Sequence, residues 1–328
     1  MVKKTILVGL PFVLAGLLAA GCGDDTTSSD GPPAGVTNEE QAITALATGD
    51  SFVQNEDQTF GDASIEPMDY GTFGKIAADV IPVSWGRFVE EVTVSATTTI
   101  ADGDSIATVN VVRNSTGTFR VLAKQTPEDT AVVLIEKPFA DQSVRNVIFR
   151  RIGRDGARFW LNWIPVSTSL VDGKTVNPPE DQTVTLTELQ LVRPSGDTIT
   201  ITDPTNFYLR YPWSNMMDHR APMDVPEMSF GESFSIRATV VSSSPDTDLV
   251  ALKYGFSPAS RRRMGVPMIS QTENGDGTFT RVYGVTAEVR HQPGFFHAGV
   301  VVLSHKTLYD DDPASYSVNW WGVPYRVR

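Results

Sequence analysis

The chain has one cysteine, Cys22, among 328 residues, so no disulfide bond forms within it and the fold depends on its core alone. It has only four histidines and no His-Glu-x-x-His pattern, and it lacks a Gly-x-Ser-x-Gly elbow and a glycine-rich phosphate loop. Positive charge is also scarce, because 27 Lys and Arg against 39 Asp and Glu give a net charge of -12. Such a surface repels phosphate backbones, so nucleic acid is not an expected partner.

The N-terminal segment joins Lys3 and Lys4 to an apolar run from Ile6 to Leu18. This run is shorter than the roughly 20 apolar residues that a membrane-spanning helix needs, and its pattern is typical of a secretion signal. It ends in Leu18-Ala19-Ala20-Gly21-Cys22, which resembles the lipobox of bacterial lipoproteins. Ala19 departs from that pattern, since the family usually has a large aliphatic residue there. An ordinary signal peptidase site with a cysteine nearby is the alternative.

The lipobox resemblance implies that residues 1–21 are a lipoprotein signal peptide and that Cys22 carries a thioether-linked diacylglycerol and an amide-linked fatty acid such as palmitate. Gly23 after the cysteine resembles the sorting pattern for the outer membrane. We therefore expect an envelope protein anchored to the outer membrane, on its periplasmic face or at the cell surface. Residues 23–33 have no large apolar side chain, which predicts a flexible acidic tether over residues 22–36.

Periodicity predicts a mostly β protein. Thr37 and Glu40 form a capping-box pattern at the start of a helix that ends at Gly49, and a second short helix is expected over residues 73–80. Strands are expected over residues 92–100, 106–113, 119–124, 131–135, 144–152, 157–166 and 186–192, with a turn at residues 114–117. This order predicts an α+β domain over residues 37–205, with helices on a curved antiparallel sheet. In element order alone it resembles the NTF2-like folds.

Residues 206–328 predict a second domain, a β-sandwich. Alternating apolar residues indicate strands over residues 234–240, 250–256, 279–285, 295–303 and 315–327, and residues 274–277, Asn-Gly-Asp-Gly, indicate a hairpin turn. Strands and turns at this spacing resemble an immunoglobulin-like or fibronectin-type III sandwich. The Cys, Trp, Cys trio of antibody domains is absent, so the resemblance extends to the architecture and to no particular family.

Two features suggest chemistry. Ser105 lies in Gly-Asp-Ser-Ile, which resembles the nucleophile motif of GDS-type lipases and esterases, but no histidine has Asp three places before it, and a turn is the simpler interpretation. Asp310, Asp311 and Asp312 are three consecutive carboxylates that repel one another unless water or a cation screens them. They are the candidate ligands for a structural calcium ion, although the full spaced pattern of a calcium loop is absent. No catalytic residue is assigned and no other cofactor is expected.

Aromatic side chains are the candidate binding residues: Trp320, Trp321, Trp213 and Tyr211. Trp320 and Trp321 are adjacent, so on a strand one ring points inward and the other outward. An outward ring stacks on a sugar or anchors a protein partner. Packing in the core or between the domains is the alternative for all four.

These observations favour a membrane-anchored envelope lipoprotein that acts as a binding or scaffolding module for a protein or glycan partner. An envelope hydrolase of glycans or esters is the first alternative, and an accessory subunit of an export or assembly complex is the second. Whether the protein is an enzyme stays open, and its oligomeric state does not follow from the sequence.

Overall fold

The computed structural model describes residues 36–49, 66–67, 79–101, 105–153, 162–176, 183–193, 195–210, 226–254, 262–290 and 293–328. In these residues the protein is mostly β, as the sequence predicts: besides two α-helices, α1 (Glu39–Gly49) and α3 (His305–Tyr309), and the short 3-10 helix η3 (Pro204–Asn206), every element is a strand. None of the described helices is long and apolar enough to cross a membrane. The predicted second helix, over residues 73–80, falls almost entirely outside the described residues.

The larger sheet, sheet A, runs in the order β1-β2-β3-β4-β6-β17-β16-β12-β13, with β5 and β9 beside β4 and β10 beside β17. Its ladders are antiparallel except for the short parallel pair of β10 and β17. The strands are β1 (Glu66–Pro67), β2 (Ile81–Ile100), β3 (Ile106–Lys124), β4 (Val133–Arg151), β5 (Trp163–Ser169), β6 (Val171–Thr175), β9 (Tyr208–Arg210), β10 (Glu227–Met228), β12 (Leu249–Tyr254), β13 (Arg262–Gly265), β16 (Gly294–Leu303) and β17 (Val318–Val327).

Sheet B contains five strands in the order β14-β15-β11-β7-β8. They are β7 (Val184–Val192), β8 (Thr198–Ile201), β11 (Ser233–Ser242), β14 (Met268–Glu273) and β15 (Phe279–Glu288). The predicted hairpin turn at residues 274–277 is confirmed, because it joins β14 to β15 and its glycines, Gly275 and Gly277, have φ of 76° and 85°. Only glycine adopts this left-handed backbone without steric cost.

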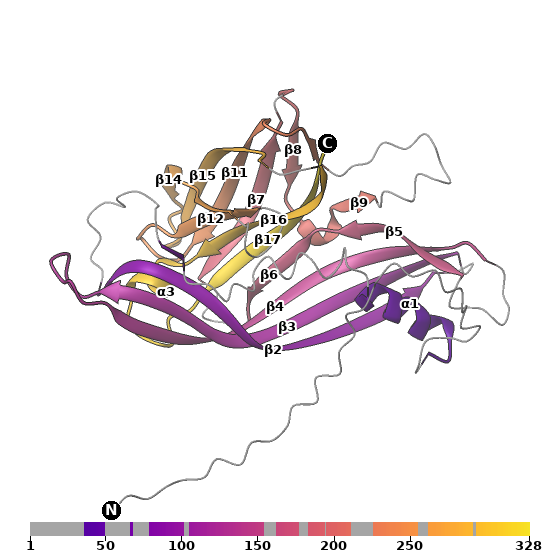
Figure 1. Cartoon of the computed structure of the whole chain (residues 1–328), viewed down its shortest axis with the longest axis horizontal. Coiled ribbons are helices and arrows are strands. Elements are labelled where there is room, and N and C mark those ends of the chain that lie inside the picture. Colours follow the sequence, from indigo (N-terminus) through magenta and orange to yellow (C-terminus); the bar gives the residue numbers. More distant parts are fainter. Residues whose placement is uncertain are drawn as a thin grey trace, which may run out of the picture.

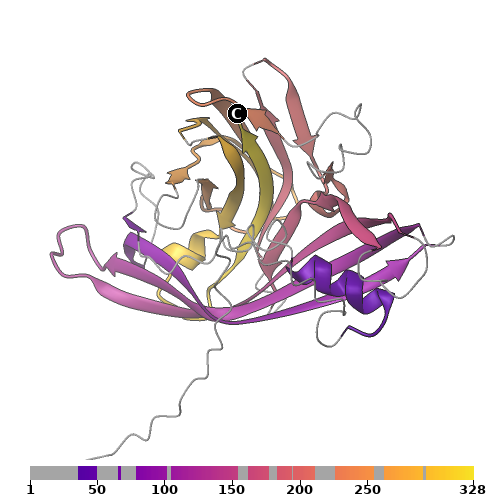
Figure 2. The same ribbon diagram turned by 45° about the vertical axis from the view of Figure 1, so that its right-hand side comes forward.

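The two sheets pack face to face in a sandwich-like arrangement (Figures 1 and 2). One core cluster combines residues of sheet B, such as Leu189, Ile236 and Tyr283, with residues of sheet A, such as Leu252 and Val300. The apolar side chains of both inner faces are removed from water in this core, and this burial stabilises the packing of the two sheets. A sandwich-like arrangement is therefore present, and it includes β7 and β8, which precede the predicted start of the second domain at residue 206.

Strands from both sides of residue 205 share each sheet. In sheet A, β6 pairs with β17, so that Gly173 faces Trp320 across the ladder. In sheet B, β7 pairs with β11 over residues 184–192. The hydrogen-bonded ladders thus run continuously across the boundary that the sequence predicts between residues 205 and 206.

The predicted turn at residues 114–117 is wrong, because β3 continues through it between β2 and β4. Asn114 accepts a hydrogen bond from Gln142 Nε2 of the next strand at 3.0 Å. Gly117 lies beside a bulge of β2, where a Cβ atom would come within 2.0 Å of the Phe88 carbonyl oxygen. Glycine and asparagine here serve a close approach of strands and a cross-strand hydrogen bond rather than a change of direction.

Helix α1 covers one face of the long strands, as predicted for the N-terminal part (Figure 2). Its residues Ile43 and Ala47 pack against Val109, Val147 and Phe149 of β3 and β4. The helix start is one residue later than predicted: Asn38 Oδ1 accepts from the Gln41 backbone N–H at 2.8 Å, so Asn38 is the capping residue.

The two ends of sheet A meet. Arg263 of β13 lies 3.7 Å from the ring centre of Trp85 of β2, and its Nη1 donates to the Trp85 carbonyl oxygen at 3.2 Å. The sheet therefore curves around a second core that includes Phe119, Phe139 and Trp320. Leu308 places α3 in this core, at the point where β2 begins.

Candidate functional site

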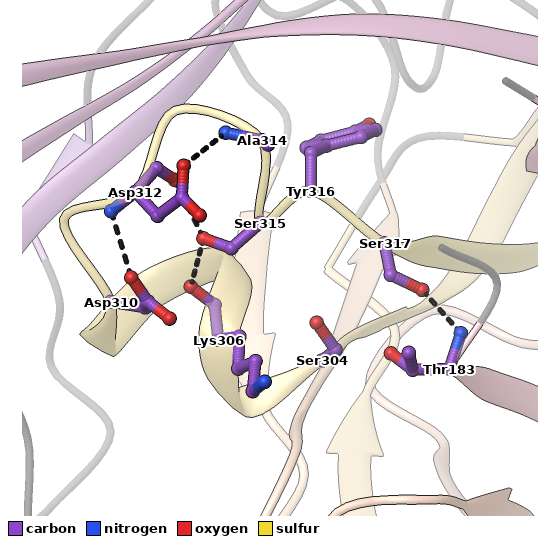
Figure 3. Close-up of a pocket in the computed structure, with 9 residues that line it drawn as sticks. All are labelled: Thr183, Ser304, Lys306, Asp310, Asp312, Ala314, Ser315, Tyr316 and Ser317. Carbon is purple, nitrogen blue, oxygen red and sulfur yellow. Dashed lines mark hydrogen bonds between the residues drawn. The ribbon is translucent and has the colours of Figure 1, made fainter. Parts of the chain in front are cut away.

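A polar pocket of about 340 Å³ lies where α3 leads into β17 (Figure 3). Its lining is mostly polar, with hydroxyl, carboxylate and amine side chains, and is contributed by Thr183, Ser304, Lys306, Asp310, Asp312, Ala314, Ser315, Tyr316 and Ser317. All but Thr183 come from one stretch of 14 residues around α3, so this local segment shapes the pocket. In the described part of the chain it is the candidate ligand site.

Local hydrogen bonds fix the shape of this segment. Ser304 caps α3 by accepting from the Thr307 N–H. Past the helix, Asp310 Oδ1 accepts from the Asp312 N–H at 2.8 Å, and Asp312 Oδ1 accepts from the Ala314 N–H at 2.9 Å. Aspartates in successive turns do this because their short side chains bond the backbone two residues on.

Lys137 of β4 holds the segment that lines the pocket. Its Nζ donates to the carbonyl oxygens of Lys306 and Asp310, at 2.8 and 2.7 Å, and to Ser315 Oγ at 2.6 Å. A cation at the C-terminal end of α3 complements the partial negative charge of the helix carbonyls, and here it adds a donor to the Lys306 carbonyl oxygen, which already accepts from the Asp310 N–H. Burial lowers the pKa of Lys137 to about 8, against the opposing effect of the nearby carboxylates of Asp310, Asp312 and Asp311.

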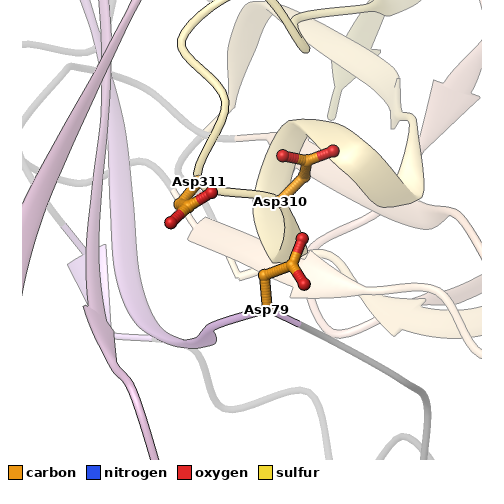
Figure 4. Close-up of side chains that lie close together, drawn as sticks. All are labelled: Asp79, Asp310 and Asp311. Carbon is orange, nitrogen blue, oxygen red and sulfur yellow. The ribbon is translucent and has the colours of Figure 1, made fainter.

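The structure brings Asp310 and Asp311 together with Asp79, which lies just before β2 (Figure 4). Their carboxylate oxygens lie within 4.8 Å of one another. The Asp79 N–H donates to the Tyr309 carbonyl oxygen at 3.1 Å, which holds the two segments side by side. Three carboxylates supply part of the six to eight oxygens that calcium takes. The predicted calcium site stays a prediction, with Asp79 as an added ligand and Asp312 engaged in the turn.

Trp320 and Trp321 lie on opposite faces of β17, and both are covered, with exposed fractions of 4% and 3%. Trp320 belongs to the core inside the curve of sheet A, and Trp321 to the core between the sheets. Trp321 Nε1 also donates to Asp172 Oδ1 at 3.0 Å. Both rings thus pack in the core, which is the alternative to ligand binding that the sequence leaves open. Neither ring presents an open face to a ligand.

The other predicted residues divide between two outcomes. Trp213, Tyr211 and Cys22 lie outside the described residues. Ser105 lies next to β3, in the hairpin that closes with a hydrogen bond from the Ala101 N–H to the Ile106 carbonyl oxygen, in agreement with the turn interpretation.

No protein-family model matches the chain, and no curated protein matches it. The chemistry of the site therefore follows from its own residues. The pocket offers carboxylate acceptors, the amine donor of Lys306 and several hydroxyl groups that both donate and accept. This set suits a ligand rich in hydroxyl or amine groups and has no large apolar surface to bind an apolar one.

Sequence reasoning missed Lys137, Ser315 and Thr183. These residues carry no motif, and the hydrogen bond from Lys137 to Ser315 joins positions 178 residues apart. The run Asp310 to Asp312 was the only signal in the sequence that pointed to this region.

Proposed function

We propose that the protein is a lipid-anchored lipoprotein of the bacterial cell envelope that binds a protein or glycan partner through the pocket beside α3. Cys22 carries the lipid, and the outer membrane is the proposed location. The observation that supports binding is the pocket itself, in which two carboxylates, one amine and five hydroxyl-bearing side chains surround about 340 Å³. The polar lining favours a sugar unit of an envelope polysaccharide, or a polar side chain of a protein.

The proposal includes the finer fold resemblances. The sandwich of the C-terminal part is immunoglobulin-like or fibronectin-type in architecture, and the helix on the curved sheet is NTF2-like in element order. Both serve as rigid frames that position loops for recognition. The pocket lies on such a frame, since its segment is held by Lys137 of β4 and continues into β17.

Calorimetry of the purified mature protein with purified envelope polysaccharide tests the binding. Lys306→Gln and Asp312→Asn each remove a charge from the pocket, and each is expected to weaken binding roughly tenfold, which is about 1.4 kcal/mol. Lys174→Gln is the matched control, because Lys174 is an exposed lysine of β6 that does not line the pocket. Equal binding by all variants would remove the pocket from the proposal. Failure to bind polysaccharide and to capture an envelope protein would remove the function.

The anchor is tested separately, by growing cells with radioactive palmitate. Label is expected on the wild-type chain and not on Cys22→Ser. An unlabelled wild-type chain would overturn the lipoprotein proposal whatever the pocket binds.

A further inference from the structure

Within the described residues, strand β2 has a long unpaired edge. Among the described strands, β1 pairs with β2 only at Ser84 and Trp85, whereas β3 pairs along the whole opposite side of β2 (Figure 1). From Val92 to Ile100 this edge has no charged residue and no proline. Natural sheet edges usually carry such residues because unpaired backbone groups recruit other strands.

The hydrogen-bond pattern shows which backbone groups face outward. The Ala101 N–H donates to the Ile106 carbonyl oxygen, so residue 101 and, by the alternation of an antiparallel ladder, the odd-numbered residues before it bond to β3. The even-numbered residues therefore direct their N–H and C=O groups away from the sheet. They are Val92, Val94, Ala96, Thr98 and Ile100.

The side chains of this edge differ between its two halves. Thr98 Oγ1 is 2.8 Å from Thr44 Oγ1 of α1, and Ala96 and Ile100 pack against the core cluster beneath that helix. Val92 and Val94 lie on the same face beyond the helix and are 39% and 49% exposed. In one half of this stretch, α1 thus covers the side chains that point to its face of the sheet. In the other half, two valine side chains on that face lie in water.

We infer that two copies of this chain join through their β2 edges, antiparallel, about a two-fold axis at Ala96. In this register Val92 pairs with Ile100 of the second copy and Val94 pairs with its Thr98. The covered half of each edge then lies beside the uncovered half of the other, so α1 of the second copy approaches the exposed valines. The interface is isologous and closes as a dimer.

Charge also favours this arrangement over a parallel one. Glu90 and Glu91 precede the uncharged stretch. A parallel, in-register pair would place these carboxylates side by side, and like charges directly opposite destabilise a ladder. The antiparallel register keeps the two copies of Glu91 at opposite ends, each level with Ala101 of the second copy. Glu90 comes level with Asp102 in the sequence, so one like-charge contact remains at each end, fewer than in the parallel pair.

Sedimentation and cysteine cross-linking test the dimer in the full chain carrying Cys22→Ser, where an introduced cysteine is the only one. Ala96→Cys is expected to give a disulfide-linked dimer under mild oxidation. Thr272→Cys, on the exposed strand β14, is the control: it is expected to remain a dimer in sedimentation and to form no disulfide-linked dimer under the same oxidation. A monomeric mass at the highest soluble concentration, or equal cross-linking of the two variants, would overturn the inference.

Val94→Lys introduces a charge into each half of the proposed interface and is expected to halve the sedimentation mass. Ile269→Lys makes the same change at a residue of β14 that is 54% exposed, and it is expected to leave the dimer intact. Circular dichroism confirms that both variants are folded, since each position tolerates exposure to water. A dimer that survives Val94→Lys, or a wild-type monomer that instead binds a strand of another protein, contradicts self-pairing through β2.

Discussion

The ion pair of Arg281 and Asp248 offers a sharp test of the packing, because both side chains are fully buried. Arg281 Nη1 donates to Asp248 Oδ2 at 2.6 Å, Nη2 donates to the Ser244 carbonyl oxygen at 2.6 Å, and Nε donates to Gln271 Oε1 at 2.7 Å. Asp248 also accepts from the His305 N–H at 3.2 Å. The pair therefore ties β15 of sheet B to the segment that begins β12 and to α3.

Replacement of Arg281 by Met keeps most of the side-chain volume but leaves the Asp248 carboxylate buried without its cation. Breaking a buried pair in this way costs about 3–5 kcal/mol of unfolding free energy. Urea unfolding of Arg281→Met at neutral pH measures the loss. Arg290→Met is the control, because the Arg290–Glu288 pair is exposed and such pairs contribute roughly 0–1 kcal/mol.

The loss should depend on pH with a definite sign. Burial raises the pKa of Asp248, and the Arg281 charge opposes this rise. Without the guanidinium the folded-state pKa rises further above the value of about 3.9 for an unfolded aspartate. Between these two values the folded variant binds more protons than the unfolded chain, so its unfolding free energy falls as pH rises. The deficit relative to wild type should therefore shrink as the pH is lowered from about 7 toward 5.

Two results would refute this reasoning. One is a loss in Arg281→Met no larger than that in Arg290→Met. The other is a deficit that widens on acidification. A double variant with Asp248→Asn should lose less than the sum of the two single variants, since it leaves neither charge unpaired.

Three further predictions concern the site and the strands beneath it. Gly173→Ala should destabilise the protein by about 1–3 kcal/mol in urea unfolding, because its Cβ would lie 1.9 Å from the Trp320 ring and overpack the core; an unchanged midpoint would contradict the observed packing. Lys137→Met should cost roughly 1–3 kcal/mol, since it removes the amine that bonds the Asp310 carbonyl oxygen and Ser315 Oγ, and should weaken ligand binding through movement of the pocket segment; full stability would exclude the supporting role. If calcium binds, millimolar CaCl₂ should raise the melting temperature of the wild type and not of Asp310→Asn, whereas equal shifts would remove the predicted site.

The period-two patterns determined much of the fold. They placed β11 and β15 correctly. The Asn-Gly-Asp-Gly sequence indicated the hairpin at residues 274–277, where two glycines with positive φ are needed, and the capping-box pattern of Thr37 and Glu40 predicted the helix that covers the curved sheet. These are local properties, since each depends on side-chain alternation or on backbone conformation within a few residues.

The tertiary structure decided what the local patterns leave open. Residues 114–117 have turn-forming composition, yet strands on both sides of β3 keep them extended. Trp321 had to lie opposite Trp320, but only sheet packing determined that both faces of β17 are covered. Asp79 meets Asp310, and Lys137 meets Ser315, only because sheet A curves until its distant segments touch. Sequence periodicity specifies which side chains share a face, whereas the element that covers that face is chosen by long-range packing.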